Sequence, residues 1–291
     1  MRKRNWAKYN RSLVQRGSIT FWIDIDFLKN SDFQDPTKGR PRFKTLLIHL
    51  GWTLKVAYKL SFRALQGYLN SLLDLMGIEK ELPHYTLFCK RGHEVASLLP
   101  KLSTRRPVEL VIDSSGLKIY GEGEWKTHKH GREKRRRWLK IHTAVDPKSG
   151  ECISSILTDE RGADSSFLSP LIEATPKSIQ RVYADGAYDT FKCRESLRKR
   201  GIEEVIPPRK GATLNPHLQL RSQSIQEIKG LGGDINLWKK LKGYGRRSLA
   251  ETFFSRLKIW YKERLSCRSF SNQQIETLLC IHSLNRMMRI A

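Results

Sequence analysis

The chain has 291 residues, and its 54 lysines and arginines against 29 aspartates and glutamates give a formal net charge of +25 at pH 7. An excess of positive charge on this scale indicates a polyanionic partner, and nucleic acid is the first candidate. An anionic membrane surface is the second candidate. The sequence offers neither an apolar run of about 18 residues nor an amphipathic basic anchor, so no membrane partner is expected.

The cysteines indicate a reducing environment. They are odd in number and scattered, at Cys89, Cys152, Cys193, Cys267 and Cys280. None forms a C-x-x-C pair, so the sequence predicts neither a zinc site nor a disulfide framework. The N-terminal segment carries no secretory signal, and we therefore expect a cytoplasmic protein.

Residues 1–42 are expected to form a basic arm and a linker. The first 23 residues contain six basic side chains and no acidic one, and residues 34–41 are polar and rich in turn formers. A segment of this composition is typical of a flexible arm that contacts phosphate groups.

Residues 43–103 are predicted to form a small all-α domain. Leucines at helical spacing predict one helix near residues 46–54 and a second that begins after an N-cap at Ser61. A third short helix ends with Lys90 and Arg91. Three such helices are compatible with a helix-turn-helix module in which these two basic residues contact DNA, although helical trios also occur for purely structural reasons.

From residue 104 onward the pattern is that of an α/β domain, predicted to extend to residue 291. Apolar β-rich runs predict five strands, at residues 108–112 with an extension at 117–120, and at 138–145, 152–157, 181–184 and 204–206. Hairpins come first and helical crossovers follow, which predicts a mixed sheet covered by helices. Prolines and glycines interrupt residues 207–243, and the pattern there predicts no element.

Two aspartates directly follow apolar strand residues. Asp113 follows Val111-Ile112 of the first strand, and Asp185 ends the fourth. Acids at strand ends lie at the sheet edge, where α/β sheets bind their ligands. If the two strands are neighbours the carboxylates converge, and divalent cations would compensate their repulsion. Two such ions about 4 Å apart stabilise in-line attack on a phosphodiester. Each aspartate alone is equally well explained as a turn acid.

A helix predicted from about Ser248 carries a third acid. Its buried stripe has helical spacing and consists of Ala250, Phe253, Phe254, Leu257, Trp260 and Tyr261. On the polar face Glu251 is aligned with Lys258, and Arg247 lies about one turn before it. Such a carboxylate among cations suits a metal ligand beside a polyanion. The alternative is a capping box, in which Glu251 reaches back to the start of the helix at Ser248.

A strongly basic loop lies between the first two strands. Residues 126–140 hold eight basic side chains against one acid, and tryptophans flank the run. Such a loop favours contact with DNA phosphates and stacking on bases. The residues expected to bind DNA are Trp125, Lys126, Arg132, Arg135, Arg136 and Arg137.

Several other polar residues receive structural interpretations. His128 and His130 lack further ligands nearby in the sequence, and His142 alternates within a strand as a core residue does. Asp189 is interpreted as the N-cap of the helix that starts at Thr190. The motifs of phosphate-binding loops, serine hydrolases and zinc proteases do not occur.

Four segments together resemble a known family. They are D-S-S-G-L-K-I-Y-G-E-G-E-W around Asp113, K-I-H-T-A-V-D ending at Asp146, A-D-G-A-Y-D around Asp185, and a Tyr-x-x-Arg-x-x-x-Glu-x-x-x-x-x-x-Lys signature. The combination resembles a bacterial insertion-sequence transposase of the DDE class, and within it the large family numbered five among insertion sequences. Every spacing of the signature is intact, at Tyr244, Arg247, Glu251 and Lys258.

The resemblance implies a ribonuclease-H-like fold for residues 104–291 and an enzyme that binds two Mg²⁺ ions, for which Mn²⁺ can substitute. Asp113, Asp185 and Glu251 would be the catalytic residues and metal ligands. Such an enzyme binds the terminal inverted repeats of its element, cleaves at the element ends and joins the 3′ hydroxyl to target DNA. Tyr244, Arg247 and Lys258 would contact DNA near the scissile bond.

The same resemblance implies double-stranded DNA as partner and at least a dimer in the DNA complex, located at the bacterial nucleoid. Two alternatives remain open at this point. One is a magnesium-dependent nuclease that hydrolyses DNA without joining it. The other is a non-catalytic DNA-binding regulator, which would share the charge and the helices but would have no use for three acids in these contexts.

Overall fold

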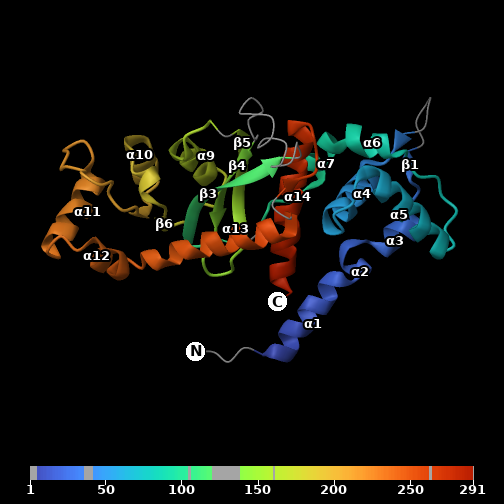
Figure 1. Ribbon diagram of the computed structural model, residues 1–291, viewed down its shortest axis with the longest axis horizontal. Coiled ribbons are helices and arrows are strands. Elements are labelled where there is room, and N and C mark those ends of the chain that lie inside the picture. Colours follow the sequence, from blue (N-terminus) through green and yellow to red (C-terminus); the bar gives the residue numbers. More distant parts are fainter. Residues whose placement is uncertain are drawn as a thin grey trace, which may run out of the picture. The chain divides into compact units, whose positions relative to one another are not determined.

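The computed structural model describes residues 5–35, 42–103, 106–119, 138–159, 161–261 and 264–290. The chain divides into two compact units (Figure 1). Unit 1 comprises Met1–Pro100 together with Leu265–Ala291, and unit 2 comprises Lys101–Arg264. This division differs from the expected domain 104–291, because the last helix of the chain packs with the N-terminal helices.

Unit 1 is helical. Its helices are α1 (Trp6–Gly17), α2 (Ile19–Trp22), α3 (Ile25–Asn30), α4 (Thr45–Ala57), α5 (Phe62–Leu75), α6 (Tyr85–Lys90), α7 (Gly92–Leu98) and α14 (Phe270–Arg289). Two short strands, β1 (Gln34–Asp35) and β2 (Arg42–Phe43), pair antiparallel. Helix α5 begins as predicted, because the Ser61 side chain accepts a hydrogen bond from Ala64 N at 3.2 Å.

The N-terminal segment differs from the expected flexible arm. Residues 6–30 form three helices, and Phe21, Trp22 and Phe27 are buried in unit 1. The basic residues suggested an arm on phosphate, but the apolar residues that follow them supply enough buried area to order the segment. Residues 1–4 and 36–41 lie outside the described residues.

An ion pair inside unit 1 joins α14 to α4. Lys55 and Glu276 are 3% and 5% exposed, and Lys55 Nζ lies 3.5 Å from Glu276 Oε1. Glu276 also accepts from the backbone N–H groups of Ser266 at 3.1 Å and Cys267 at 2.9 Å. These partners compensate the loss of water around the buried carboxylate.

Unit 2 is built on a mixed sheet of β3 (Glu109–Ile119), β4 (Trp138–Val145), β5 (Cys152–Asp159), β6 (Arg181–Tyr183) and β7 (Glu203–Val205). These five lie in the order β5-β4-β3-β6-β7, and a two-residue strand, β8 (Arg264–Leu265), also pairs with β3. Strand β4 runs in the direction opposite to the other four. This is the ribonuclease-H-like arrangement that the resemblance implies.

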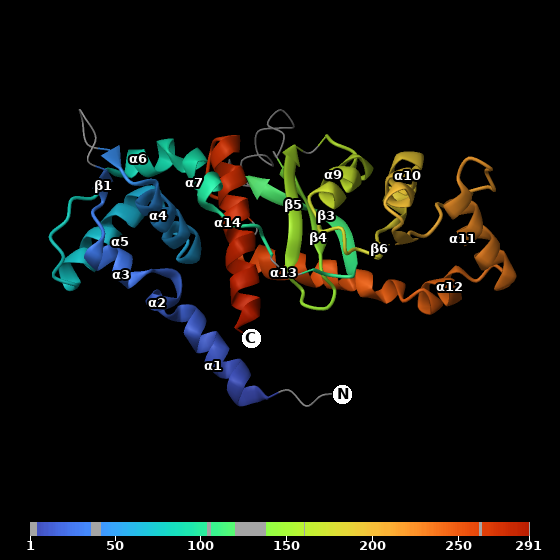
Figure 2. The ribbon, with the colours of Figure 1, turned by 180° about the vertical axis from the view of Figure 1, so that it is seen from behind.

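Unit 2 also contains helices. They are η1 (Asp164–Phe167), α9 (Leu168–Glu173), η2 (Gly186–Tyr188), α10 (Phe191–Lys199), α11 (Gln219–Gly230), α12 (Ile235–Leu241), η3 (Tyr244–Arg247) and α13 (Ser248–Tyr261). Leu110 and Ile112 of β3 pack in one core with residues of α9 and α10. Helix α13 runs along the sheet on one side, as the two opposite views agree (Figures 1 and 2).

The segment 207–243, for which the sequence predicts no element, contains α11 and α12. Asp234 caps α12 through Asn236 N and Leu237 N. In the part of the chain that the structure describes, no helix has the length and the apolar character that crossing a membrane requires.

We expect Glu276→Ala to destabilise unit 1 by about 3–5 kcal/mol, because removing one partner of a buried pair leaves the other buried and uncompensated. Calorimetric unfolding of the whole chain measures the effect. Glu81→Gln is the control, since Glu81 is exposed and accepts a surface hydrogen bond from Gln34. Equal free energies of unfolding for the two variants would show that the Lys55–Glu276 pair does not stabilise the packing of α14.

Candidate active site

The pairing of β3 with β6 brings two aspartates together. The strands are parallel, with Val111 opposite Tyr183. Asp113 and Asp185 each lie two residues further along, so the continued register sets them side by side. Because side chains alternate between the faces of a sheet, both point away from the face that packs on α9 and α10. The prediction that the first and fourth strands are neighbours is confirmed.

The two aspartates differ in their backbone setting. Asp113 lies inside β3, which continues to Ile119, so it is neither a turn acid nor at a strand end. Its Oδ1 accepts from Ser114 N at 2.9 Å. Asp185 directly follows β6, and its Oδ1 accepts from Ala187 N at 2.8 Å. The Asx-turn interpretation of Asp185 is therefore correct, and it coexists with a place beside Asp113.

One arginine joins the first and third acids. Arg247 Nη1 lies 2.7 Å from Asp113 Oδ2, and Arg247 Nη2 lies 2.6 Å from Glu251 Oε1. Both carboxylates are thus bound to the terminal nitrogens of a single guanidinium group. Burial of Ala250 and Phe253 against the sheet leaves Glu251 on the open side of α13, where its side chain is 59% exposed.

The capping-box alternative for Glu251 is not what the structure contains. Its Oε1 accepts from Arg247 Nη2 at 2.6 Å. The Ser248 hydroxyl donates to the carbonyl of Gly245 at 2.9 Å. Glu251 is therefore engaged with the neighbouring side chain that also binds Asp113.

The same neighbouring charges shift the pKa values of Asp113 and Tyr244. Burial raises the pKa of Asp113, the Ser114 N–H group and Arg247 lower it, and the charges of Asp185 and Glu251 raise it again. Burial likewise raises the pKa of Tyr244, which Arg247 lowers and the same three acids raise further. The charges of all three carboxylates therefore act on the pKa of Tyr244.

The donor set fits a hard divalent cation. Carboxylate oxygens are the ligands that Mg²⁺ and Mn²⁺ prefer. Across the residues that the structure describes, no three His, Cys, Asp or Glu side chains are arranged to hold a metal ion. The positive charge beside Asp113 and Glu251 is instead the guanidinium of Arg247. This guanidinium and a cation would compete for the two carboxylates.

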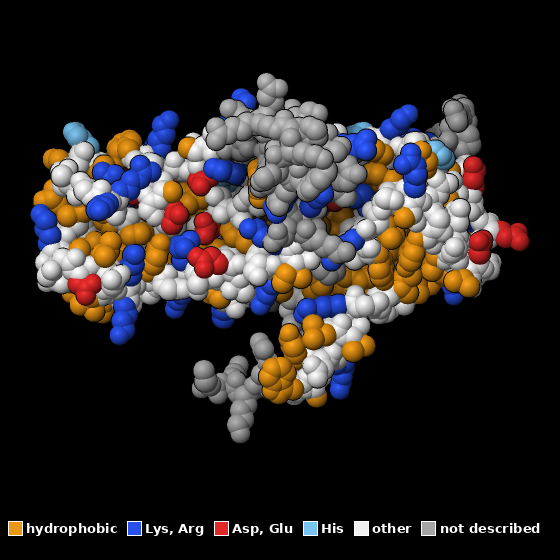
Figure 3. All heavy atoms as spheres, viewed as in Figure 1, with side chains coloured by type: hydrophobic (Ala, Val, Ile, Leu, Met, Phe, Trp, Pro, Cys, Tyr) orange, Lys and Arg blue, Asp and Glu red, His pale blue; other side chains and the backbone are white. Residues whose placement is uncertain are grey.

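On the face seen in Figure 3, acidic side chains gather in the region of β6 and the start of α13, with lysine and arginine side chains next to them.

The other residues expected to bind DNA have different settings. Lys258 is half-buried on α13, and Lys90 is exposed at the end of α6. Arg91 needs a correction: it is 8% exposed, and its guanidinium donates to Phe43 O at 2.6 Å and to Glu94. The hydrogen bond from Arg91 lowers the pKa of Glu94 to about 2, so Arg91 belongs to the interior of unit 1. The expected loop contacts Trp125, Lys126, Arg132, Arg135, Arg136 and Arg137 lie outside the described residues.

Asp189 also needs a correction. Helix α10 is capped by Thr190, whose side chain accepts from Cys193 N at 3.3 Å. The Asp189 carboxylate is wholly buried and pairs with arginines from two helices. Local pattern cannot reveal this, because one of these arginines is far away in the sequence.

Family models recognise the chain. The model described as "Transposase DDE domain" matches residues 104–286, which is more than half of the chain. The chain belongs to the transposase DDE-domain family. A second model with the same description matches residues 14–122.

This DDE-domain protein is similar to individual transposases over part of their length or at low sequence identity. Over 98 residues it is 37% identical to a putative transposase for insertion sequence element IS402 from Burkholderia cepacia, which covers 30% of this chain and 46% of that relative. The chain thus matches less than half the length of this relative. A cryo-EM structure of the piggyBac transposase synaptic complex with hairpin DNA is similar at a TM-score of 0.45 and 10% identity, over 96% of this chain and 75% of that one.

These findings confirm the resemblance to insertion-sequence transposases of the DDE class. The narrower assignment to the family numbered five stays a prediction.

His142 behaves as the core residue that its position in the strand predicts. It is buried, its ring stacks on Phe167 at 4.3 Å, and Nε2 lies 3.1 Å from Thr158 Oγ1. Burial lowers its pKa to about 4, against a smaller opposite effect of Asp164. A neutral, enclosed imidazole is not placed to act as a base on a substrate.

We therefore expect His142 to make unit 2 less stable as the pH falls from about 6.5 to 4. In that window the unfolded chain takes up a proton at this site and the folded chain does not, which costs about 1.4 kcal/mol per pH unit. Urea unfolding at pH 7 and at pH 5 measures the free energy of unfolding of wild type and of His142→Phe. Between these two pH values the variant should lose less of this free energy than wild type. His217→Asn, at an exposed histidine, should follow wild type. Parallel curves for wild type and His142→Phe would contradict the assignment.

Proposed function

We propose that this DDE-domain protein is a DNA transposase that cleaves DNA at the ends of an insertion sequence and joins the resulting 3′ hydroxyl to target DNA. The observation that carries the proposal is the parallel register that sets Asp113 beside Asp185, with Glu251 linked to Asp113 through Arg247. Membership of the family and the likeness to a putative insertion-sequence transposase support it.

Asp113, Asp185 and Glu251 would be the ligands of two Mg²⁺ ions, or of Mn²⁺ in their place. Bound there, divalent ions supply polarisation of a water or a 3′ hydroxyl and stabilisation of in-line displacement at phosphorus. The protein's own contribution is to bring the carboxylates together on one face of a rigid sheet and to keep apolar core on the other.

Arg247 would change partner when DNA binds. In this structure its guanidinium binds two carboxylates, a favourable arrangement of charge-assisted hydrogen bonds. A phosphate group offers the same bidentate geometry. Moving the guanidinium to a phosphate would free Asp113 and Glu251 for cations, so DNA binding would favour cation binding. Tyr244 and Lys258 would contact DNA beside it.

Double-stranded DNA is the proposed partner, both as element end and as target. The net charge of +25 supports extensive contact with phosphates, and Lys90 together with the basic loop would take part in it. Joining two ends to one target requires at least two copies of the chain in the complex. We propose that the complex acts at the nucleoid.

We expect Asp113→Asn to leave binding to element-end DNA within about two-fold and to lower strand cleavage at least about 100-fold, because a ligand charge is lost at the reacting phosphate. The assay uses the DNA that flanks the gene, provided as labelled fragments with Mg²⁺. Asp159→Asn is the control, since Asp159 is an exposed aspartate at the end of β5.

Two outcomes would change the assignment. Cleavage by wild type without joining of a pre-nicked end to plasmid DNA would favour the nuclease. Unchanged behaviour of Asp113→Asn, with no cleavage by wild type either, would favour the regulator.

The affinity for element-end DNA should fall steeply with salt. Each phosphate that a lysine or arginine neutralises contributes about −0.9 to the slope of log K against log salt concentration. A titration between about 50 and 200 mM salt, where contact with six to ten phosphates costs roughly 10³–10⁵ in affinity, gives the slope. A flat response would be incompatible with a phosphate-dominated interface.

A further inference from the structure

A single short turn joins the candidate ligand Asp185 to the buried carboxylate of Asp189. Within it Tyr188 N donates to Asp185 O at 3.1 Å, and Asp189 N donates to Gly186 O at 3.2 Å. Asp185 lies at one end of the turn, facing the acidic cluster. Asp189 lies at the other end, inside unit 2.

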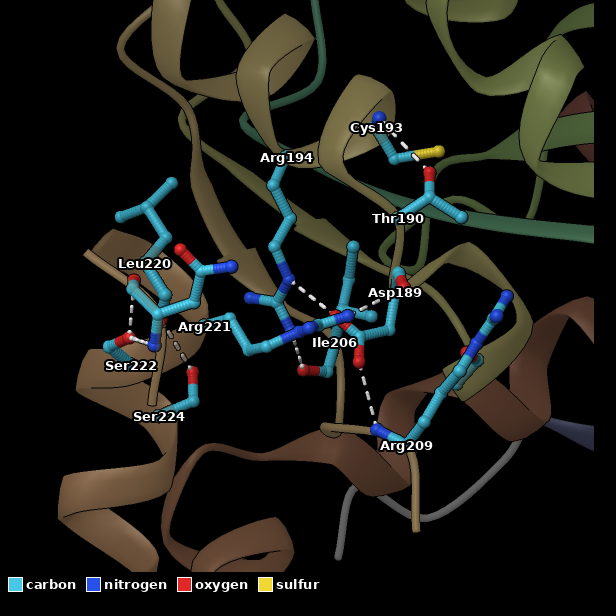
Figure 4. A network of polar contacts seen from close by, with 12 residues as sticks. Asp189, Thr190, Cys193, Arg194, Ile206, Arg209, Leu220, Arg221, Ser222 and Ser224 are labelled. Atoms are coloured by element: carbon cyan, nitrogen blue, oxygen red, sulfur yellow. Dashed lines mark hydrogen bonds and ion pairs between the residues drawn. The ribbon is translucent and has the colours of Figure 1, made fainter. Parts of the chain in front are cut away.

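The Asp189 carboxylate holds three parts of the chain together (Figure 4). Its Oδ1 accepts from Arg194 Nε at 2.8 Å and from Arg221 Nε at 2.9 Å, and its Oδ2 accepts from Arg209 N at 2.9 Å. Arg194 belongs to α10, Arg221 to α11, and Arg209 to the segment after β7. Burial raises the pKa of Asp189, but the bonds from Arg221 and Arg209 outweigh it and keep the group ionised.

Arg209 contacts the same turn a second time. Its Nε donates to Gly186 O at 3.0 Å, and its Nη2 donates to Ala187 O at 2.8 Å. Its backbone N–H group already binds Asp189. One residue thus fixes the turn at the two carbonyls in its middle and at the carboxylate that ends it.

The turn formed by residues 185–189 also fixes the direction of the Asp185 side chain. Ala187 N donates to Asp185 Oδ1 at 2.8 Å, so a rotation of that peptide group would move the carboxylate. Arg209 Nε donates to the carbonyl of Gly186, which belongs to the same peptide group as Ala187 N. A path of direct hydrogen bonds therefore leads from the Arg209 guanidinium through the turn to Asp185.

We propose that Arg209, anchored by Asp189, is a positioning residue that orients the Asp185 carboxylate for cation binding. The inference rests on the proposed function, since it needs Asp185 to be a cation ligand. It also gives the segment 207–243 a role. Through Arg221 on α11 and Arg209 at its start, this segment is bonded to the turn that carries Asp185.

Arg209 is the residue to test. Asp189 and Arg194 are buried, and their replacement would damage the fold as well as the turn. Arg209 is exposed, so Arg209→Ala removes the two bonds to the carbonyls while its backbone N–H group stays on Asp189. Arg209→Lys is the conservative variant, because an ammonium group can still donate to both carbonyls. Arg198→Ala is the control: Arg198 is an exposed arginine whose guanidinium pairs with Glu195 on α10.

Two measurements on the DNA-free chain decide the proposal. Hydrogen exchange followed by mass spectrometry reports on the peptide that contains residues 185–190, and electron paramagnetic resonance of free Mn²⁺ reports cation binding. We expect Arg209→Ala to speed exchange in that peptide about ten-fold and to weaken Mn²⁺ binding roughly ten-fold, the low end for residues that orient a ligand. Its melting temperature should stay that of wild type. Arg209→Lys should recover most of both effects, and Arg198→Ala should show neither.

Two outcomes would overturn the proposal: exchange in Arg209→Ala equal to that in Arg198→Ala, or faster exchange with unchanged Mn²⁺ affinity. Failure of the proposed function has a different signature. There wild type and Asp113→Asn would bind Mn²⁺ equally weakly, whatever the exchange at residues 185–190 shows.

Discussion

The parallel pairing of β3 with β6 is the constraint on which the candidate site depends. It aligns the strands residue by residue, and the alternation of side chains then leaves no freedom in where Asp113 and Asp185 point. A slip of one residue in either strand would turn its aspartate into the core beside α9 and α10. Such a slip is unfavourable because it would bury an aspartate in the apolar core that Leu110, Ile112 and Val182 form with α9 and α10. Core packing thus specifies the geometry of a polar site.

Unit 2 balances its carboxylates with arginine in two different ways. Around Asp113 the balancing group is Arg247, which is partly exposed and binds a largely exposed Glu251. Around Asp189 it is Arg194 and Arg221, with the carboxylate wholly buried. An exposed ion pair exchanges partners at little cost, whereas breaking a buried one costs several kcal/mol. The first arrangement suits a site that must accept new ligands, and the second suits a fixed support next to it.

The sequence predicts best where local pattern and tertiary structure agree. Strand 138–145 and the cap at Ser61 follow from alternation and from capping chemistry, and the acids stand out because polar residues rarely follow apolar strands. It fails where burial depends on distant partners. In the sequence Arg91 resembles a DNA contact, but in the structure it is buried and binds Phe43 and Glu94. In the sequence Asp189 resembles an N-cap, but in the structure it is a buried partner of two arginines. The sequence does not predict the first three helices as ordered elements, because the basic residues of this segment suggest a flexible arm. The apolar side chains that order the segment are buried against other helices of unit 1.

Unit 1 is formed from two separate stretches of the chain, whereas unit 2 is one continuous stretch. Chains emerge from the ribosome in order and domains fold as units, so unit 2 can be complete before α14 has been made. During that interval Lys55 lacks the carboxylate of Glu276, and the surface of α4 that α14 covers stays open to water. During synthesis unit 1 therefore completes its folding only after α14 has emerged. The nascent chain then folds unit 2 before unit 1.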